Sequence, residues 1–335
     1  MLDFSNSKIL IVGDVMLDKY YFGKVDRISP EAPVPIVNIQ KEESRLGGAS
    51  NVANNIVSLG GHSLLCGVIG HDLFGKEIER ISRHKNIDTF LLKTSSPTIT
   101  KARIIGGKQQ IVRVDYEDKS ELNADNKKLF RDTISRILPE YDILVISDYG
   151  KGLISEDLCR YLIKLAHKYD KKVIIDPKGK NWEKYSGADI VTPNVKELSD
   201  IVGYTVPNTD RAIEKAAREA ITNNHLTALL VTRSDKGMSL IGPIPPIHIP
   251  THSEEVFDVS GAGDTVVATL GLCLAAGFEN SQYCSRYRRE ENRYSYAYHR
   301  RISTTKIKNP VPFLKIFVSA GNRIFYLPLH IPIKY

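Results

Sequence analysis

An acidic residue follows a pair of closely spaced glycines in the segment DVSGAGDT, which spans residues 258–265. An apolar run of helical length comes next, over residues 266–272. Small residues before a helix leave its first N–H groups open to an anion such as a phosphate. Asp264 could then take a proton from a hydroxyl group. The charge on a phosphoryl group would be held by three backbone amides, those of Gly261, Ala262 and Gly263. The alternative is an acid that caps an ordinary helix.

A second glycine pair stands near the other end of the chain. Gly47 and Gly48 begin a predicted helix, and Asn51 follows one turn later. Glycines permit the close approach of a polyhydroxylated ligand, and an amide side chain both donates to and accepts from hydroxyls. These residues are therefore candidate sugar ligands.

A third candidate segment lies just past a predicted strand and consists of Asn194, Val195, Lys196 and Glu197. A glutamate three residues after an asparagine is typical of a helix cap. A glutamate in this place could also organise a hydrated Mg²⁺ ion. Both interpretations stay open at this point.

Alternating strands and helices must position these groups. Short apolar runs predict strands over residues 8–14, 64–69, 143–147, 172–176, 189–192 and 228–232. Helices are predicted between them, over residues 47–59, 73–83, 126–137, 156–169, 210–223 and 261–276. This alternation implies an α/β fold with a doubly wound, mostly parallel sheet and helices on both faces. Ligands of such sheets bind beyond the carboxyl ends of the strands, where Asp14, Asp148, Asp176 and Asn194 fall.

Two stretches break the alternation. Residues 20–40 contain three prolines and short β-like pieces, and residues 98–115 are typical of a hairpin that turns at Gly106 and Gly107. We expect a small β lid over the ligand crevice, covering about residues 18–40 and 98–116. Its outer face could pair with a second copy of the chain, which predicts a homodimer through the lid. The alternative is a pair of surface hairpins.

Composition favours a cytoplasmic protein. A chain of 335 residues suits one large α/β domain or two small ones. We expect no signal peptide, because the first residues lack a basic segment followed by an apolar run. We also expect no membrane partner, since no apolar stretch approaches spanning length. The four cysteines are scattered without metal-type spacing, which favours reduced thiols.

The net charge of +7 is unevenly distributed. Residues 283–335 hold 11 Lys/Arg against 2 Asp/Glu, a net of +9, which leaves −2 for the rest of the chain. The same segment has five tyrosines in quick succession, at 283, 287, 294, 296 and 298. Basic residues interleaved with aromatics could indicate a nucleic-acid-binding segment.

Taken in order, these motifs resemble those of the ribokinase-like, or carbohydrate kinase, family. GGASN at 47–51 is similar to its N-terminal substrate signature, DVSGAGDT to its C-terminal signature, and N-x-x-E at 194–197 is also characteristic. Four shorter segments resemble the heptose 7-phosphate kinases within this family: GDVMLD at 13–18, ISPEAPVP at 28–35, SDYGKG at 147–152 and DPKG at 176–179. The resemblance runs from about Lys8 to Gly277.

The resemblance implies an enzyme that uses ATP and Mg²⁺ to phosphorylate D-glycero-β-D-manno-heptose 7-phosphate at O1. Asp264 would be the base, and the amides of Gly261, Ala262 and Gly263 the anion hole. Residues 194–197 would bind the nucleotide and the metal, with Glu197 serving Mg²⁺. The residues flanking the nucleotide would be Thr232, Arg233, Ser234, Lys236 and Gly237. Those facing sugar hydroxyls would be Asp14, Asp18, Gly47, Gly48, Asn51 and Asp148.

The phosphate that such a substrate already carries needs cations. The candidates lie in the predicted lid or in strand-end loops, and they are Lys101, Arg103, Lys151 and Lys178. The alternative for each is an ordinary solvated surface charge. The expected partners are thus a sugar phosphate, ATP and a second copy of the chain.

After Gly277 the sequence departs from the family pattern, which continues with an Ala-rich helix, a Gly-Thr turn and a strand. Residues 283–302 read YCSRYRREENRYSYAYHRRI. Permitted codons for this run, read one base later, give IVAGIVEKKIGTATLIIEEF, which has the expected pattern. We therefore predict a kinase domain over residues 1–282 and an out-of-frame tail over 283–335. One missing or extra base near codons 278–282 would produce it. The Arg/Tyr mixture is then a by-product of shifted codons, and we expect no nucleic-acid partner.

Overall fold

The computed structural model describes residues 3–118, 120–251 and 261–277. It also gives four short strands further on: β14 (Leu314–Lys315), β15 (Val318–Ala320), β16 (Arg323–Phe325) and β17 (Pro328–Leu329). Residues 258–260 of the DVSGAGDT motif lie outside the described residues. So do the proposed site of the frame change and the rest of the predicted tail.

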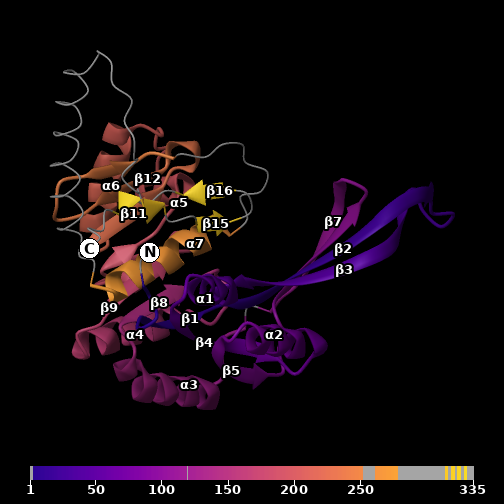
Figure 1. The fold of residues 1–335 in the computed structure, drawn as a ribbon, viewed down its shortest axis with the longest axis horizontal. Coiled ribbons are helices and arrows are strands. Elements are labelled where there is room, and N and C mark those ends of the chain that lie inside the picture. The colour runs from indigo at the N-terminus through magenta and orange to yellow at the C-terminus, as the bar shows by residue number, and fades with distance from the viewer. Residues whose placement is uncertain are drawn as a thin grey trace, which may run out of the picture.

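A nine-stranded sheet forms the centre of the molecule (Figure 1). Its order is β13 (Ile247–Ile249), β12 (Met238–Ile241), β11 (Ala228–Thr232), β10 (Ile190–Val191), β9 (Lys172–Asp176), β8 (Ile143–Ser147), β1 (Lys8–Gly13), β4 (His62–Gly70) and β5 (Asp88–Thr94). The strands from β11 to β5 pair in parallel, and β12 and β13 add an antiparallel edge. Runs such as ILVIS in β8 are buried on both faces, as central parallel strands require.

Helices cover both faces of this sheet, which confirms the predicted doubly wound fold. One face carries α1 (Ala49–Ser58), α2 (Leu73–His84) and α7 (Ala262–Ala275). The other carries α3 (Ala124–Ile137), α4 (Glu156–Lys168), α5 (Val195–Val202) and α6 (Asp210–Asn223). Alternate residues of β1 separate the two cores, because Ile9 and Ile11 pack with α1 and α7 whereas Leu10 and Val12 pack with α3 and α4. Short 3₁₀ turns are η1 (Leu138–Glu140), η2 (Glu183–Tyr185) and η3 (Ser234–Lys236).

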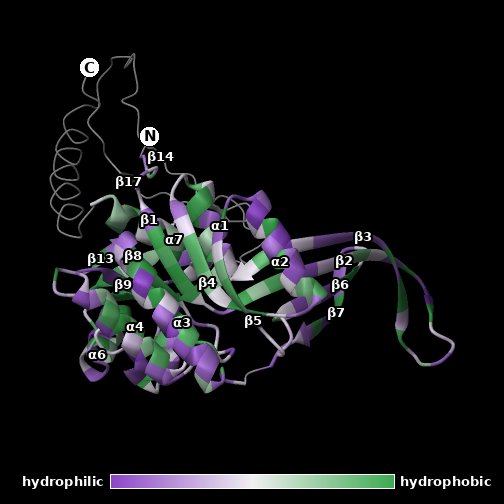
Figure 2. Cartoon of the chain, turned by 90° about the horizontal axis from the view of Figure 1, so that it is seen from below, coloured by the Kyte–Doolittle hydropathy of each residue, from purple (hydrophilic) through white to green (hydrophobic). Residues whose placement is uncertain are grey.

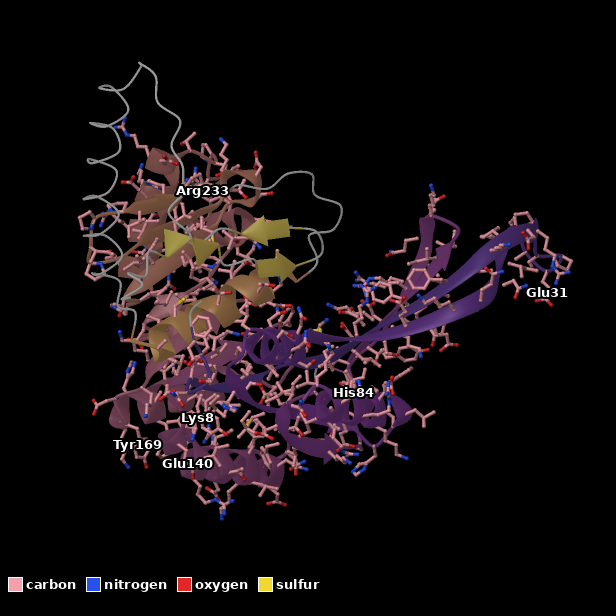
Figure 3. All side chains as sticks on the ribbon, in the orientation of Figure 1. Lys8, Glu31, His84, Glu140, Tyr169 and Arg233 are labelled. Carbon is pink, nitrogen blue, oxygen red and sulfur yellow. The ribbon has the colours of Figure 1, made fainter. Side chains whose placement is uncertain are left out.

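A separate four-stranded sheet extends from one side of the body as a long arm (Figure 1). Its order is β3 (Pro35–Gly48), β2 (Val15–Ile28), β6 (Thr100–Gly106) and β7 (Gln109–Tyr116). The predicted small sheet is therefore present, although β2 and β3 are long strands and not short pieces. The prolines fit because Pro30 and Pro33 lie in the tip between the strands and Pro35 is the first residue of β3. Glu31 lies at the far end of the arm (Figure 3).

Helix α7 is unusual among these helices because it is apolar on nearly all sides and almost wholly buried. The central strands are mostly hydrophobic too, as Figure 2 shows for β1. The start of α7 is its more exposed part, since Gly261 and Ala262 are half-buried and Gly263 is exposed, so its free N–H groups can be reached from outside. Across the described ranges, no helix combines the length and apolarity that a membrane crossing needs.

Candidate active site

Asp264 lies in the first turn of α7 and is only 5% exposed. Gly261 is the N-cap residue of this helix, with φ +78°, a left-handed conformation that glycine adopts without strain. Within the described part of the chain, the side chain of Asp264 bonds to residues outside its own helix. It accepts hydrogen bonds from the Tyr149 hydroxyl at Oδ1 (2.5 Å) and from Asn51 Nδ2 at Oδ2 (2.6 Å). The contacts of Asp264 are thus tertiary contacts and not those of a helix cap.

Asn51 brings the two glycine motifs together. It lies in α1 and reaches across to α7, where a β-carbon on Gly261 would come within 2.7 Å of its amide nitrogen. A β-carbon on Gly263 would meet nothing within 4 Å, so the space before the first turn is open among the described residues. The N–H groups of this turn can therefore be approached by an anion.

Burial raises the pKa of the Asp264 carboxyl above its ordinary value. The hydrogen bonds from Tyr149 and Asn51 lower it, the nearby Asp18 raises it and Lys101 lowers it. A carboxylate that is buried but held by neutral donors keeps its basicity and its orientation. This is what a general base requires.

Asp14 follows β1 and is 2% exposed. Its Oδ2 accepts hydrogen bonds from the backbone amides of Tyr149 (2.9 Å) and Lys151 (3.1 Å), while its buried Oδ1 has no partner within the described part of the chain. Burial raises the pKa of Asp14 to about 6. In the structure this predicted sugar ligand anchors the loop after β8.

Asp148 also anchors the loop that follows β8. Its Oδ1 accepts from the Gly150 amide (2.8 Å), and its Oδ2 contacts the Lys184 ammonium and accepts from the Tyr185 hydroxyl (2.7 Å). The two residues from η2 were not among the predicted site residues. Together Asp14 and Asp148 fix the loop of residues 148–151 at the sheet edge.

The lid brings Asp18, Lys101 and Arg103 together. Asp18 of β2 is paired with Lys101 in the register of β6, and its Oδ1 accepts from Arg103 Nη1 at 2.6 Å. Gly47 leaves the space that the Asp18 carboxylate occupies, since a β-carbon on residue 47 would lie 2.5 Å from Asp18 Oδ2. The Lys101 ammonium lies 5.8 Å from the ring centre of Tyr149, and burial lowers the pKa of this lysine.

The other two predicted phosphate ligands are paired with glutamates. Lys151 makes an ion pair with Glu117, and Lys178 Nζ lies 3.0 Å from Glu197 Oε1. Lys178 is thereby associated with the predicted nucleotide segment. Of the four cations, the structure brings Lys101 and Arg103 together on the lid beside Asp18.

Asn194 and Glu197 form a reciprocal capping box at the start of α5. Asn194 Oδ1 accepts from the Glu197 amide (2.9 Å), and Glu197 Oε2 accepts from the Asn194 amide (3.1 Å). The helix-cap interpretation is therefore confirmed. It does not exclude a metal role, because the carboxylate stands at the carboxyl edge of the sheet.

The predicted nucleotide loop follows β11 and includes η3. Gly237 has φ +80°, and a β-carbon there would overlap the backbone of β13 and the residues after it. Arg233, 3% exposed and labelled in Figure 3, donates to Asn208 Oδ1 (2.9 Å), Asp210 Oδ1 (2.6 Å) and Ser239 Oγ (2.9 Å). Lys236 donates to the Asn208 carbonyl (2.7 Å). Arg233 and Lys236 thus hold the loop in place.

The residues present fit a Mg²⁺ ion that arrives with a nucleotide. Burial, then the carboxylates of Asp264 and Glu197, raise the pKa of Asp176 well above its ordinary value. Such a concentration of negative charge favours a cation. Mg²⁺ usually keeps several waters and binds through one or two carboxylates and substrate phosphates. Accordingly, the described residues contain no dedicated cage of three or more ligands.

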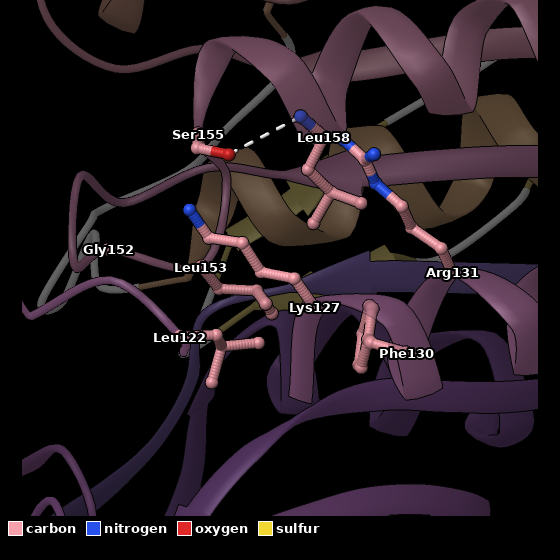
Figure 4. Close-up of a pocket in the computed structure, with 8 residues that line it drawn as sticks. All are labelled: Leu122, Lys127, Phe130, Arg131, Gly152, Leu153, Ser155 and Leu158. Atoms are coloured by element: carbon pink, nitrogen blue, oxygen red, sulfur yellow. Dashed lines mark hydrogen bonds between the residues drawn. The ribbon is translucent and has the colours of Figure 1, made fainter. Parts of the chain in front are cut away.

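A surface pocket lies elsewhere, between α3 and the start of α4 (Figure 4). It is lined by Leu122, Lys127, Phe130, Arg131, Gly152, Leu153, Ser155 and Leu158. No predicted site residue lines it. Its two cations are paired, Lys127 with Glu121 and Arg131 with Asp157. This pocket is therefore separate from the candidate active site.

A doubly wound sheet with a β lid, and a buried acid at an open helix start beside Asn51, are features expected of a carbohydrate kinase. The sequence profile described as pfkB family carbohydrate kinase matches residues 6–285. The chain belongs to this family.

The curated relatives are longer proteins. The chain is 46% identical over 285 residues to the bifunctional protein HldE of Haemophilus influenzae (strain PittEE), and 43% identical over 283 residues to that of Actinobacillus pleuropneumoniae serotype 5b. These alignments cover 84% of this chain but only 59% and 58% of the two relatives.

Solved structures share the fold at lower identity. The tetrameric inhibited form of phosphofructokinase-2 from Escherichia coli has a TM-score of 0.68 and 21% identity, with 82% of this chain and 88% of that chain covered. Arabidopsis thaliana ribokinase, complexed with ribose and ATP, has a TM-score of 0.63 and 19% identity, with the same coverage. The predicted ribokinase-like fold is confirmed.

Proposed function

We propose that this chain phosphorylates D-glycero-β-D-manno-heptose 7-phosphate at O1, with ATP as the donor, in the cytoplasm and for lipopolysaccharide core synthesis. The observation that carries the proposal is Asp264, a buried acid held by Tyr149 and Asn51 beside an open helix N-terminus. The four heptose-kinase-like segments and the HldE relatives support the substrate.

In the proposed reaction the O1 hydroxyl gives its proton to Asp264 as its oxygen attacks the γ-phosphorus. The new O1–P bond forms while the bond from the γ-phosphorus to the β–γ bridging oxygen breaks, and that oxygen leaves with its electron pair as part of ADP. The amides of Gly261, Ala262 and Gly263 would hold the charge on the transferring group. Positioning and electrostatics suffice, because phosphoryl transfer needs little covalent help from protein.

Mg²⁺, when bound with the nucleotide, neutralises phosphate charge during transfer. Glu197 and Asp176 are the residues that would hold it. The nucleotide would lie between residues 194–197 and the loop that ends at Gly237. In that position its terminal phosphate faces the start of α7.

The phosphate of the substrate would be bound by Lys101 and Arg103. The support is their position: both lie on β6 of the lid beside Asp18, and burial lowers the pKa of Lys101, which disfavours its charged form. A phosphate placed beside the Lys101 ammonium would offset the free-energy cost of burying its charge. Asp18 would then share Arg103 with the substrate and face a sugar hydroxyl.

The lid also supports the proposed homodimer. Several apolar side chains of its strands and tip are exposed: Val25, Ile28, Val34, Ile39, Ile111, Val112, Val114 and Tyr116. An exposed sheet with such residues is a surface that another copy could cover.

We further infer the frame change at codons 278–282. The family match ends at residue 285, close to the predicted point of departure. Resequencing the gene tests this directly. An indel relative to close homologues is expected, and an intact frame without one would refute it.

The function is tested by coupled ADP-release assays with heptose 7-phosphate, fructose 1-phosphate, fructose 6-phosphate and ribose. Both the chain and a frame-restored version, with IVAGIVEKKIGTATLIIEEF at 283–302, are assayed. We expect the heptose to be preferred. Turnover of another sugar alone would assign a different ribokinase-like kinase. Nucleotide binding without turnover in the given chain, rescued in the restored one, would identify a binding remnant made by the altered tail.

A further inference from the structure

Tyr149 is the closest polar neighbour of the proposed base, although its sequence context gave it no separate role. Its hydroxyl donates to Asp264 Oδ1 at 2.5 Å, across 115 positions of sequence. We propose that Tyr149 is a positioning residue that fixes the Asp264 carboxylate and leaves Oδ2 to take the substrate proton. The inference rests on the proposed function, because it assigns a role within the same reaction.

The two carboxylate oxygens are not equivalent. Oδ2 is the one that faces the helix start, 3.6 Å from where a β-carbon of Gly261 would lie. It also accepts from Asn51, but a carboxylate oxygen has two lone pairs, so a second partner can be added. Oδ1 is turned toward Tyr149. Because the Tyr149 phenol occupies Oδ1, Oδ2 is the oxygen left to accept the proton of the reacting hydroxyl.

The backbone of Tyr149 is held as firmly as its side chain. Its amide donates to the buried carboxylate of Asp14 (2.9 Å), and the next residue donates to Asp148 (2.8 Å). The loop cannot move without breaking contacts to buried acids, which is costly. Such support from surrounding residues is what holds a reacting group in productive geometry.

Tyr149 stays a hydrogen-bond donor over the working pH range. Burial, followed by the charge of Asp264, raises the pKa of this phenol well above its ordinary value. Among the residues that the structure describes, the titratable groups that act on Asp264 are Tyr149 from the loop after β8, Asp18 from β2, Lys101 from β6 and Asp176 from β9. Loss of the phenol would remove a stabilising donor from the Asp264 carboxylate and raise its pKa.

The test is the pH profile of kcat for Tyr149→Phe in the full chain, with heptose 7-phosphate and ATP. We expect kcat to fall about 10-fold, as for loss of one hydrogen bond to a charged group. KM for both substrates should change less than about 3-fold. The acid limb of the profile should move to higher pH.

Tyr185→Phe is the matched control, because it removes the same kind of phenol-to-carboxylate bond, at Asp148 and not at Asp264. It should reduce thermal stability without moving the acid limb. If Tyr149→Phe does not fold, 3-fluorotyrosine at 149 keeps the bond with a more acidic donor and should move the limb to lower pH.

Two outcomes with the phenylalanine variants would overturn the inference: an unmoved acid limb with wild-type kcat in Tyr149→Phe, or equal limb shifts in Tyr149→Phe and Tyr185→Phe. An unmoved limb with 3-fluorotyrosine would do the same. The failure of the proposed function has a different signature. In that case the unsubstituted chain shows no heptose turnover, or Asp264→Asn retains it.

Discussion

Three buried carboxylates at the edge of the sheet differ in what holds them. Asp148 is held by the Lys184 cation as well as a phenol, and Asp14 by two backbone amides. Asp264 is held by a phenol and a side-chain amide, both neutral. A cationic partner stabilises the ionised carboxylate and makes it a weaker base. Neutral donors orient the carboxylate and leave it better able to accept a proton. The donors of Asp14 are neutral as well, so what distinguishes Asp264 is its place in the first turn of α7, beside the open helix start, and this place supports its proposed role as the base.

Asp264→Asn should abolish phosphoryl transfer and spare binding. We expect kcat to fall about 10²–10⁴-fold, the usual contribution of a positioned general base. The amide can still accept from Tyr149 or Asn51, so the site should keep its shape. Steady-state kinetics and calorimetric titration with ATP measure the two effects. Substantial turnover in this variant would contradict the assignment.

Asp14→Asn should stabilise the protein at neutral pH. The pKa of Asp14 is about 6 in the fold against an ordinary value of 3.8, so folding favours its protonated form. That stabilisation is complete below about pH 4 and is lost as pH rises through 6. A neutral amide avoids the loss, which predicts a gain in unfolding free energy of up to about 3 kcal/mol at pH 8, because one pKa unit corresponds to about 1.4 kcal/mol.

Urea unfolding of the Asp14 variant at pH 4.5 and pH 8 provides the measurement. The gain should shrink at the lower pH. A gain of equal size at both values would show that ionisation of Asp14 is not its cause.

Among the elements, the turn that holds η3 depends most on a single residue. Gly237→Ala adds a β-carbon that overlaps the backbone near β13, and it also strains a positive φ. Gly203→Ala has the same φ of +80° and meets nothing within 4 Å, but its ψ of 9° lies in the left-handed helical region whereas that of Gly237 is −124°, so it reports only the milder strain of a left-handed residue.

We expect Gly203→Ala to lower the unfolding free energy by about 1 kcal/mol, and Gly237→Ala by about 2–4 kcal/mol with weaker ATP binding. Thermal melts and nucleotide titration of both variants measure this. Equal losses, with ATP affinity unchanged in both, would mean that the turn does not support the nucleotide.

The sequence was sufficient to predict the elements whose local pattern is strong. Strands 143–147, 172–176 and 228–232 and helix 210–223 have the predicted bounds, because buried β-branched runs and amphipathic periods are local signals. Strand β5 was not predicted, and helix α5 was anticipated only through the helix-cap interpretation of residues 194–197. The first is a partly exposed edge strand, and the second is only 8 residues long.

The contacts of the site were less predictable than its elements. Tyr149 meets Asp264 across 115 positions, and Lys178 meets Glu197 only because β9 and β10 are neighbours. Such pairs depend on tertiary packing, which no local pattern specifies. The backbone amides that bind Asp14 and the side chains that bind Asp148 could not be predicted for the same reason.

For the whole molecule, the proposed association of two copies through the lid arm can be tested at one exposed residue. Val112 of β7 is 45% exposed, so Val112→Asp should disrupt a lid-to-lid dimer without disturbing the core. Leu73, 78% exposed at the start of α2, is a matched apolar residue outside the lid. Light scattering coupled to gel filtration should show a dimer for the unchanged chain and for Leu73→Asp, and a monomer for Val112→Asp. A monomer in all three would reject the lid dimer.

The central claim is phosphoryl transfer to O1 of a heptose 7-phosphate with Asp264 as base. ³¹P NMR of the product, made by the chain and by its frame-restored version, tests it most directly. We predict a new phosphate signal coupled to the anomeric proton, beside the retained 7-phosphate, and none with Asp264→Asn. Phosphate on another hydroxyl, transfer only to other sugars, or an undiminished signal from the Asn variant would contradict the account.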